Sequence, residues 1–392
     1  MQFDILQTEI QEFIKGNTTA AISKLALMKN PFPAIGWSEI LTQIESRQKA
    51  KDKLPTWFSA DTIVYPPKIS IEQTSSEKTA AYKASLVNGS SIIDLTGGFG
   101  VDCNYFSKHF NSVVHCEMNH DLSAIVKHNL EHLHSNNIEC FTGDSAQILV
   151  DLGRKYDWIY IDPSRRNEHK GKVFMLQDCL PNVPELLDFY FRFSDNILIK
   201  TAPILDISAG LSELKFVKKV HIIAVDNEAK ELLWEISRNY ASTIEINTTN
   251  LKKDDTEQFT FDWNKNDHLA SYGPPETYLY EPNAAIMKSG GFAEVSARFG
   301  INKLHVNSHL YTSENLVPFP GRKFMVNAAL PYQKKELKAT LEGKKANVTT
   351  RNFPDSVEDI RKKWKISEGG SLYCFFTTDL NNNKIVLLCS KI

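Results

Sequence analysis

The most constraining feature of this 392-residue sequence is a regular alternation of strand-like and helix-like segments between residues 90 and 200. Short apolar runs typical of buried strands alternate with longer amphipathic runs typical of helices. The predicted strands are Ser91–Leu95, Ser112–Cys116, Ile138–Phe141, Trp158–Ile161 and Asn196–Lys200. The predicted helices between them are Val101–Phe110, Asp121–His134, Ser145–Leu152 and Val183–Phe193. Strands that alternate with helices build a parallel sheet with helices on both faces, so we predict a doubly wound α/β fold.

The regions on either side of this segment follow other patterns. A predicted hairpin of two strands, Val217–Val225 and Glu231–Ser237, ends the series and adds an antiparallel strand to the sheet. The polar segment Asn247–Asp255 is interpreted as a linker, and short mixed elements follow it. The predicted domains are a helical N-terminal extension (1–61), the α/β domain (62–250) and two small α+β domains (251–325 and 326–392).

Several further elements are predicted outside the α/β series. The N-terminal extension is predicted to contain the helices Asp4–Lys15 and Thr18–Lys29 and a third helix capped by Ser38. A helix is predicted over Glu72–Leu86, with Thr74, Ser75 or Ser76 as its N-cap. The C-terminal predictions are strands at Thr277–Tyr280 and His305–Tyr311, a helix at Phe292–Phe299, and then helix, strand, helix, strand and strand over 334–392, with the last turn at Asn381–Asn383.

Composition excludes several classes of protein. Hydrophobic residues make up 42% and charged residues 23% of the chain, which is typical of globular domains. No apolar run approaches the roughly 18 residues of a membrane-spanning helix. No secretory signal is apparent at the start, and the six cysteines form no CxxC pair. We therefore expect a cytoplasmic protein with reduced thiols and no membrane association.

Charge is distributed unevenly along the chain. Residues 276–392 contain 17 lysines and arginines against 11 aspartates and glutamates. Residues 1–275 contain 28 basic and 36 acidic residues. A basic C-terminal third on an acidic body indicates that the C-terminal part contacts a polyanion, although ordinary surface charge would give the same count.

A glycine-rich turn follows the first predicted strand. The segment Asp94-Leu95-Thr96-Gly97-Gly98-Phe99-Gly100 runs from the strand directly into a helix. Glycines let the backbone approach a ligand closely, and the start of the following helix favours negative charge. Turns of this kind bind dinucleotides or S-adenosylmethionine. The dinucleotide fingerprint requires a third glycine where this sequence has Cys103, which weakens the dinucleotide interpretation.

Four acidic residues follow four successive predicted strands: Asp94, Glu117, Asp144 and Asp162. In an open α/β sheet, ligands bind at the carboxyl ends of the strands. Glu117 is placed to accept both ribose hydroxyls of an adenosine, and Asp144 to accept the adenine amine. A single acid at such a position is usually a helix cap. Four in register, together with the glycine-rich turn, indicate a ligand that contains adenosine.

This constellation resembles class I S-adenosylmethionine-dependent methyltransferases over about residues 62–240. The resemblance implies a Rossmann-like, seven-stranded sheet and S-adenosylmethionine as the cofactor. The residues that it implies for cofactor binding are Asp94, Thr96, Gly97, Gly98, Phe99, Gly100, Glu117, Met118, Asp144, Ser145 and Asp162.

The segment Asp162-Pro163-Ser164-Arg165 resembles the acid-Pro-Pro-aromatic motif of nucleic-acid amino-methyltransferases. In that family the acid and the following carbonyl accept hydrogens from an amine and so orient its nitrogen. The resemblance implies a catalytic group in which Asp162 and Pro163 position the acceptor and Ser164 adds a hydrogen bond. Arg165 is expected to stack on a base or bind a phosphate, or to form a structural ion pair together with Arg166. Because Ser164 and Arg165 depart from the motif, it specifies the substrate less sharply than the cofactor.

The whole chain is also similar to a bacterial group of methyltransferase-like proteins. That group has a helical N-terminus, a ferredoxin-like insert and a C-terminal domain likened to THUMP, which is an RNA-binding domain. The segments that carry the resemblance are Glu72–Glu77, Asp162–Arg166, Lys200–Pro203 and Arg351–Pro354. It implies a ferredoxin-like domain at 251–325 and a THUMP-like domain at 326–392.

The sequence is therefore interpreted as an S-adenosylmethionine-dependent RNA methyltransferase that acts on a base nitrogen. In some uracil-carbon methyltransferases with a similar motif, a catalytic cysteine follows the fifth strand, where this chain has Lys200-Thr201-Ala202-Pro203. The resemblance therefore favours nitrogen, or a non-covalent mechanism, over uracil carbon. The alternatives are a methyltransferase for a protein or small molecule and a non-catalytic RNA-binding protein. His128, His132 and His134 share a predicted helix without a further ligand, so no metal site is expected. Nothing in the sequence indicates the oligomeric state.

Overall fold

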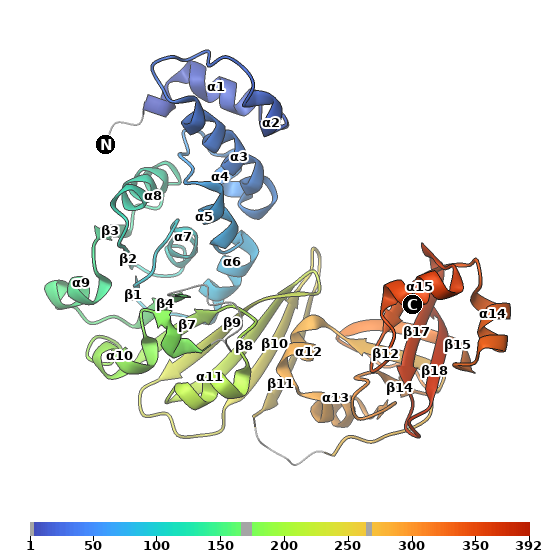
Figure 1. Ribbon diagram of the computed structural model, residues 1–392. Coiled ribbons are helices and arrows are strands. Elements are labelled where there is room, and N and C mark those ends of the chain that lie inside the picture. The colour runs from blue at the N-terminus through green and yellow to red at the C-terminus, as the bar shows by residue number, and fades with distance from the viewer. Residues whose placement is uncertain (1–3, 166–174, 264–268) are drawn as a thin grey trace. The chain divides into compact units, whose positions relative to one another are not determined.

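The computed structural model describes residues 4–165, 175–263 and 269–392 (Figure 1). These residues form two compact units. Unit 1 contains the residues up to Lys218 together with Leu233–Ser242, and unit 2 contains Lys219–Leu232 and Thr243–Ile392. In the part of the chain described, no helix is long and apolar enough to cross a membrane.

Unit 1 begins with short helices, drawn in blue in Figure 1. They are the 3-10 helix Asp4–Leu6, α1 (Thr8–Gly16), α2 (Ile22–Leu25), α3 (Trp37–Lys53) and α4 (Pro55–Ser59). The predicted helix Thr18–Lys29 is too long: only α2 forms, and Leu27 just beyond it is 89% exposed, so a longer helix would bury no further apolar face. Gly36, not Ser38, is the N-cap of α3.

The predicted helix Glu72–Leu86 is split into α5 (Lys68–Gln73) and α6 (Glu77–Leu86). The break has a local cause, because Ser76 takes an extended conformation and its side chain accepts the backbone N–H of Thr79 at 3.2 Å. Of the three predicted caps, Ser76 is therefore the one used.

The α/β prediction is confirmed by a nine-stranded sheet within the described residues, in the order β11-β10-β8-β9-β7-β4-β1-β2-β3. The strands are β1 (Ser91–Asp94), β2 (Ser112–Glu117), β3 (Ile138–Thr142), β4 (Trp158–Ile161), β7 (Asn196–Thr201), β8 (Val217–Val225), β9 (Glu228–Ser237), β10 (Glu245–Leu251) and β11 (Thr256–Asp262). The helices between them are α7 (Val101–Phe106), α8 (His120–His132), α9 (Ser145–Leu152), α10 (Val183–Tyr190) and α11 (Ile207–Glu213). β1 pairs in parallel with β2 and β4, and β3 and β7 continue the parallel order on either side. β5 (Ser164–Arg165) and β6 (Cys179–Leu180) form a separate two-stranded sheet. The 3-10 helix Leu176–Asp178 directly precedes β6.

Two strands extend the predicted seven-stranded sheet, and they show that the linker predicted at Asn247–Asp255 was wrong. β10 pairs in parallel with β8, and β11 returns antiparallel to β10. The polar side chains of β10 are buried because they have partners: Thr248 Oγ1 donates to the carbonyl of Phe259 at 2.9 Å, and Asn250 Nδ2 donates to Glu257 at 3.0 Å. Hydropathy alone therefore misses this strand, since satisfied polar groups can lie inside a sheet.

The rest of unit 2 is a seven-stranded sheet in the order β13-β14-β12-β15-β18-β17-β16, again within the described residues. Its strands are β12 (Tyr278–Pro282), β13 (Asn302–Lys303), β14 (Tyr311–Ser313), β15 (Gly321–Pro331), β16 (Lys345–Thr350), β17 (Ser367–Thr378) and β18 (Lys384–Lys391). Its helices are α12 (Ala284–Ser289), α13 (Phe292–Phe299), α14 (Lys334–Leu341) and α15 (Val357–Trp364). The order predicted over 334–392 is confirmed, and Asn382 in the last turn has φ of 65°.

Two C-terminal predictions need correction. The strand predicted at His305–Tyr311 is a loop as far as Leu310, and β14 starts only at Tyr311. Leu310 is buried all the same, so its apolar character reflects packing and not strand pairing. β15 was not predicted, and it is the strand that pairs with both β12 and β18.

Candidate active site

Four acidic residues lie where parallel strands of unit 1 end. Asp94 is the last residue of β1 and Glu117 the last residue of β2, while Asp162 directly follows β4. Asp144 follows β3 by two residues. Since β3, β2, β1 and β4 are neighbours in the sheet, their carboxyl ends share one edge.

The glycine-rich turn is shaped by contacts that allow no side chain at two of its positions. A Cβ on Gly97 would lie 2.2 Å from the ring of His115, and one on Gly100 would lie 2.8 Å from Val126. Burial lowers the pKa of His115 to about 4, so a neutral ring packs under the turn. Gly98 has φ of 53°, and its Cβ position is open, with the nearest atom 3.8 Å away. The turn is therefore packed on its inner side at Gly97 and Gly100 and open at Gly98.

Hydrogen bonds connect this turn to the neighbouring strand ends. Asp94 Oδ1 accepts the backbone N–H of Thr96 at 2.9 Å. Glu117 accepts the N–H of Gly98 at 3.1 Å and the N–H of Asn119 at 2.7 Å. The Glu117 carboxylate is thus oriented by the backbone while remaining partly exposed.

Phe99 and Met118, both predicted to bind the cofactor, have opposite surroundings. The Phe99 side chain is buried, with its ring centroid 6.2 Å from that of Trp57 and 6.4 Å from that of Tyr65. It joins the turn to the N-terminal helices and leaves only its backbone for a ligand. Met118 is 73% exposed.

Asp144 has a local structural role in addition to any role in binding. Its Oδ1 accepts the N–H of Gln147 at 2.9 Å, so it is the N-cap of α9, and Ser145 is the first residue of that helix. The side chain of Asp144 is otherwise exposed.

The Asp162 motif is joined to the turn and to β7. The N–H of Asp162 donates to Thr96 Oγ1 at 2.7 Å. Its carboxylate forms an ion pair with Lys200 from β7. Ser164 is exposed, and Arg165 pairs through its backbone with Cys179. The side chain of Arg165 and the whole of Arg166 lie outside the described residues.

A second, buried ion pair lies behind the site, and sequence reasoning missed it. Lys83 on α6 is fully buried, with Nζ 3.2 Å from Asp102 Oδ1 and 2.8 Å from Ser75 Oγ. Asp102 Oδ2 accepts hydrogen bonds from Ser75 at 2.8 Å and from Tyr160 at 3.0 Å. Burial raises the pKa of Asp102, but the charges of Lys83 and Lys200 and the hydrogen bonds from Ser75 and Lys83 outweigh burial and hold this pKa below its ordinary value. The only available signal in the sequence was the serine-rich segment Glu72–Glu77 before α6.

The carboxyl group of Asp94 makes stability depend on pH. Burial raises the pKa of Asp94 from 3.8 to about 7, opposed by the N–H of Thr96 and reinforced by the charges of Asp102 and Asp162. Between about pH 4 and 7 the folded protein therefore binds more protons than the unfolded chain, and its unfolding free energy falls as the pH rises.

Between pH 4 and pH 8, without ligand, we expect the unfolding free energy of the Asp94→Asn variant to fall less than that of the parent. The difference between the two unfolding free energies should change by up to about 4 kcal/mol over this range, which is the free energy that corresponds to a pKa shift of this size. Urea unfolding at several pH values measures it. Parallel curves for the two proteins would show that Asp94 is not the titrating group.

The residues at the strand ends fit an adenosine-containing cofactor. The open position over Gly98 leaves room for a ligand against the backbone, and the oriented carboxylate of Glu117 can accept hydroxyl groups. Within the described ranges, no group of three or more His, Cys, Asp or Glu side chains is arranged to hold a metal ion.

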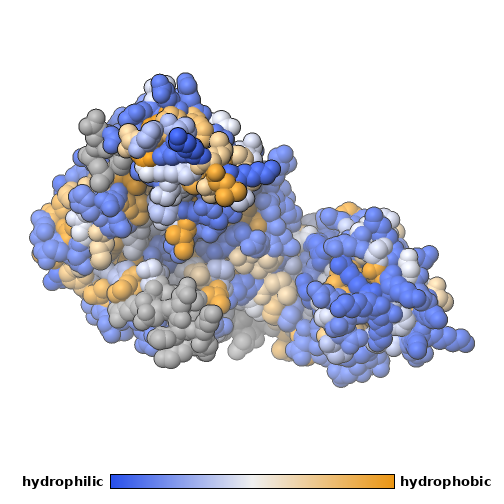
Figure 2. Space-filling view, turned by 45° about the horizontal axis from the view of Figure 1, so that its top comes forward, coloured by the Kyte–Doolittle hydropathy of each residue, from blue (hydrophilic) through white to orange (hydrophobic). Residues whose placement is uncertain are grey.

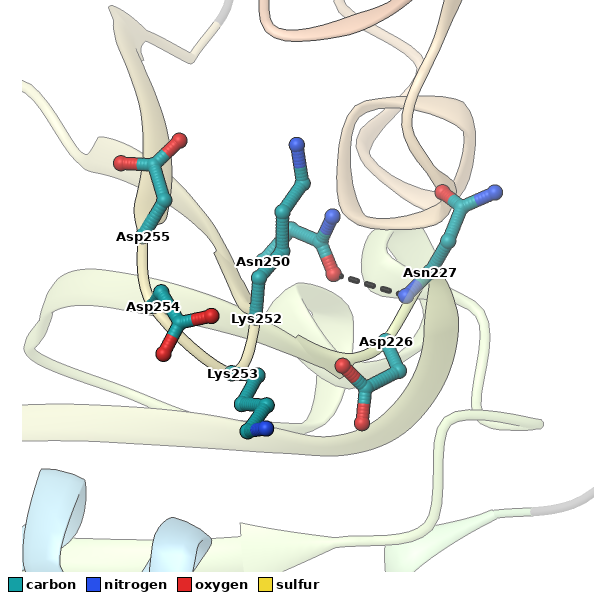
Figure 3. A pocket seen from close by; sticks show the side chains of 7 residues that line it. All are labelled: Asp226, Asn227, Asn250, Lys252, Lys253, Asp254 and Asp255. Atoms are coloured by element: carbon teal, nitrogen blue, oxygen red, sulfur yellow. Dashed lines mark hydrogen bonds between the residues drawn. The ribbon is translucent and has the colours of Figure 1, made fainter.

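A surface pocket in unit 2 involves different residues. It has a volume of about 480 Å³ and is lined by Asp226, Asn227, Asn250, Lys252, Lys253, Asp254 and Asp255 (Figure 3). The N–H of Asn227 donates to Asn250 Oδ1 at 2.9 Å across it. None of the predicted site residues lines this pocket, and its side chains belong to two hairpin turns that bind each other.

Comparison with known proteins gives matches at two levels. Residues 278–320 match a family described as a ferredoxin-like domain, and residues 321–391 match one described as THUMP domain-like. The crystal structure of a Porphyromonas gingivalis W83 protein, provisionally assigned as a methyltransferase, matches with a TM-score of 0.88 and 30% sequence identity. That match covers 100% of both chains. No curated protein sequence matches.

Other solved structures match only part of the chain. TrmK from M. capricolum, in complex with S-adenosyl-homocysteine, matches with a TM-score of 0.32 and 18% identity over 42% of this chain and 69% of its own. A Pyrococcus horikoshii protein provisionally assigned as an RNA methyltransferase matches with a TM-score of 0.32 and 13% identity over 49% of this chain and 96% of its own. Similarities of this size support no conclusion about this chain.

Proposed function

Since the chain belongs to the methyltransferase family represented by the Porphyromonas gingivalis protein, we propose that it methylates a base nitrogen in RNA with S-adenosylmethionine as methyl donor. The observation that carries this proposal is the arrangement at the sheet edge. A glycine-rich turn with open space over Gly98 lies beside the oriented carboxylate of Glu117, and Asp162 is hydrogen-bonded to the same turn.

In this proposal the turn and the strand ends hold the cofactor. Glu117 accepts the ribose hydroxyls, Asp144 and Ser145 lie beside the adenine, and the backbone from Thr96 to Gly100 contacts the rest. When bound, S-adenosylmethionine supplies an electrophilic methyl group. Asp162 and the Pro163 carbonyl orient the acceptor toward that group, and holding reactants in a productive geometry supplies much of the rate enhancement.

The RNA assignment is supported by the C-terminal part. Residues 321–391 match the THUMP-like family, and residues 276–392 have a basic excess. Figure 2 shows a predominantly hydrophilic surface on the C-terminal part at the right of that view. An RNA substrate is consistent with the predicted cytoplasmic location. The domain boundaries at 61, 250 and 325 stay part of the proposal.

Replacing the cofactor-binding groups is expected to weaken S-adenosylmethionine binding. Glu117→Ala removes a charged acceptor, which costs roughly 1.5–3 kcal/mol, or about tenfold to a hundredfold in affinity. Gly98→Leu fills the open position and should weaken binding as well. Isothermal titration calorimetry measures both variants. Glu139→Ala on β3, which removes a surface ion pair with Arg154, is the matched control and should bind like the parent. Parent-like affinity in both site variants would refute the assignment.

Reversing charges on α14 is expected to weaken RNA binding. Lys334 and Lys335 are exposed and have no ion-pair partner among the residues described. If they contact phosphates, changing both to Glu should make the slope of log affinity against log salt shallower by about 2. Lys24→Glu with Lys29→Glu in the N-terminal extension makes the same change in net charge. Filter binding of total RNA from 50 to 200 mM salt compares them, and an equal effect in both pairs would remove α14 from the RNA surface.

The activity itself is tested by comparing RNA nucleosides from cells with and without the gene. A methylated base that disappears with the gene, and returns when purified protein and S-adenosylmethionine are added to that RNA, supports the proposal. If RNA from both cells is identical and no label is transferred, the substrate is a protein or a small molecule, or the chain only binds RNA.

A further inference from the structure

Lys200 forms an ion pair with Asp162, and nothing above gives this lysine a chemical role. It is the next-to-last residue of β7, and it forms its ion pair with Asp162 Oδ2 while only 13% exposed. Asp162 is 33% exposed, so this pair is open to a ligand mainly from the side of the carboxylate. Asp162 Oδ1 accepts no hydrogen bond from the residues that the structure describes.

The ion pair changes what Asp162 can do. The ammonium group of Lys200 holds Oδ2 of Asp162, so Oδ1 is available to an acceptor in a fixed orientation. Charge-assisted hydrogen bonds of this kind are short and directional. The arrangement presents one oxygen with an adjacent positive charge. This differs from a carboxylate whose two oxygens are both available to the hydrogens of an amine.

The positive charge distinguishes two classes of acceptor. An exocyclic amine attacks while neutral, and its nitrogen becomes positive as the methyl group arrives, which an adjacent ammonium opposes. An acceptor that gives up its proton becomes more negative before attack, which an adjacent ammonium favours. A low-dielectric, partly buried site enlarges this difference.

The neighbouring charges support the same conclusion. The charges of Asp102 and Asp162 raise the pKa of Asp94, while Lys83 and Lys200 lower the pKa of Asp102. Lys83 pairs with Asp102, and Lys200 pairs with Asp162. The ammonium group of Lys83 forms an ion pair with Asp102 and donates a hydrogen bond to Ser75 in the interior. Among the described residues, Lys200 is therefore the ammonium group that lies next to the acceptor side of the cluster.

Resting on the proposed function, we propose that Lys200 is a positioning residue that holds Asp162 and selects an acceptor that loses its proton during methyl transfer. In RNA such an acceptor is a ring N–H flanked by a carbonyl group, and not an exocyclic amine.

The step balances without another reagent. The acceptor atom uses its electron pair to bond to the methyl carbon, while the carbon–sulfur bond breaks and its electron pair stays with sulfur. The proton of the acceptor passes to Asp162 and then to water. The products are the neutral methylated nucleotide, a neutral thioether and one proton.

Three proteins test this assignment: the parent, Lys200→Met and Lys200→Arg. Each is incubated with total RNA from cells without the gene and with S-adenosylmethionine labelled in its methyl group. At pH 7 we expect Lys200→Met to lose about hundredfold in kcat, within the range for loss of proton-transfer assistance, with little change in KM for RNA. The loss should narrow toward pH 9, since hydroxide then removes the acceptor proton, and Lys200→Arg should restore part of the rate.

Two measurements that do not depend on turnover accompany the assay. Calorimetric affinity for S-adenosylhomocysteine and the unfolding free energy should be close to the parent in both variants. A loss in Lys200→Met that is equal at every pH and follows a loss of stability would overturn the proposal.

The product decides the acceptor class. A base methylated at a ring nitrogen in the digest supports the inference, and chromatography against standards identifies it. A 2′-O-methyl nucleoside overturns the inference, because the acceptor is then not a base nitrogen. A methylated exocyclic amine overturns the inference but leaves the proposed RNA methyltransferase intact. If the parent transfers no label to any RNA, the proposed function fails, and the acceptor proposed here fails with it.

Discussion

Asp162→Ala is expected to abolish methyl transfer while changing S-adenosylmethionine affinity by only a few fold. Asp162 directly follows β4, its N–H is held by Thr96, and its carboxylate faces Lys200. Removing a group that both orients the acceptor and receives its proton should cost about 10²–10⁴-fold or more in kcat. The adenosine would still be held by Glu117, Asp144 and the glycine-rich turn. Single-turnover transfer and calorimetry measure the two effects separately.

Asp162→Asn separates the two roles of this carboxylate. Asparagine keeps an oxygen that can accept a hydrogen bond, but its amide cannot take a proton. Partial activity in the Asn variant with none in the Ala variant would indicate orientation of an amine. Equal loss in both would indicate proton removal, which the Lys200 proposal requires. Full activity in both would remove Asp162 from the site.

The other end of the same region of the sheet offers a control. Asp195 directly precedes β7 and forms a surface ion pair with Arg238 at 3.4 Å. Asp195→Ala changes the charge by the same amount as Asp162→Ala but lies at the amino end of the strand. Exposed pairs contribute about 0–1 kcal/mol, so this variant should be as stable and as active as the parent.

Most of the α/β unit could be predicted because its signals are local. Each buried strand is a short apolar run, and an acid ends or closely follows β1, β2, β3 and β4, so position along the chain also gives position at the sheet edge. The predicted ends at Leu95 and Cys116 lie one residue from the observed ends at Asp94 and Glu117, and the predicted end at Ile161 is confirmed. β10 could not be predicted in this way, since its buried Thr248 and Asn250 are satisfied by residues of β11 that hydropathy does not register.

The parts of the site that were missed depend on contacts between distant segments. Lys83 looks like an ordinary helix-surface lysine in the sequence, and only the fold shows that Asp102 and Ser75 surround its ammonium group. Phe99 lies within the glycine-rich turn, but its side chain is buried against Trp57 and Tyr65. A motif therefore predicted the course of the backbone, while the direction of each side chain depended on elements far away in sequence.

The segment Glu72–Glu77 acquires a physical explanation from these contacts. Ser76 caps α6, and Ser75 bridges Lys83 and Asp102. Glu77 accepts hydrogen bonds from the backbone and hydroxyl of Thr56 at 2.6 Å and from Tyr105 at 2.7 Å. The segment thus joins the N-terminal helices to α7, the helix that follows the glycine-rich turn, without contributing a reactive group.

Lys83→Met is expected to destabilise the protein by about 3–5 kcal/mol, because removing one partner leaves the buried carboxylate of Asp102 without its counter-charge. The Lys83 side chain is fully buried, so water cannot replace the ammonium group. Lys49→Met is the matched control: it breaks an ion pair with Glu72 at 3.4 Å in which both side chains are about half exposed, and should cost less than about 1 kcal/mol. Urea unfolding of the whole protein, followed by tryptophan fluorescence, compares the two.

A second substitution identifies the cause of that loss. Adding Asp102→Asn to Lys83→Met removes the uncompensated charge and should recover part of the stability, whereas volume loss or poor packing would persist in the double variant. The Lys83–Asp102 ion pair should also affect ligand binding, because Asp102 lies in the first turn of α7, the helix that begins directly after Gly100. We expect Lys83→Met to weaken S-adenosylmethionine binding and the double variant to restore it in part. A double variant that is less stable than Lys83→Met would show that the hydrogen bonds of Asp102 to Ser75 and Tyr160, and not its charge, hold this side of the site together.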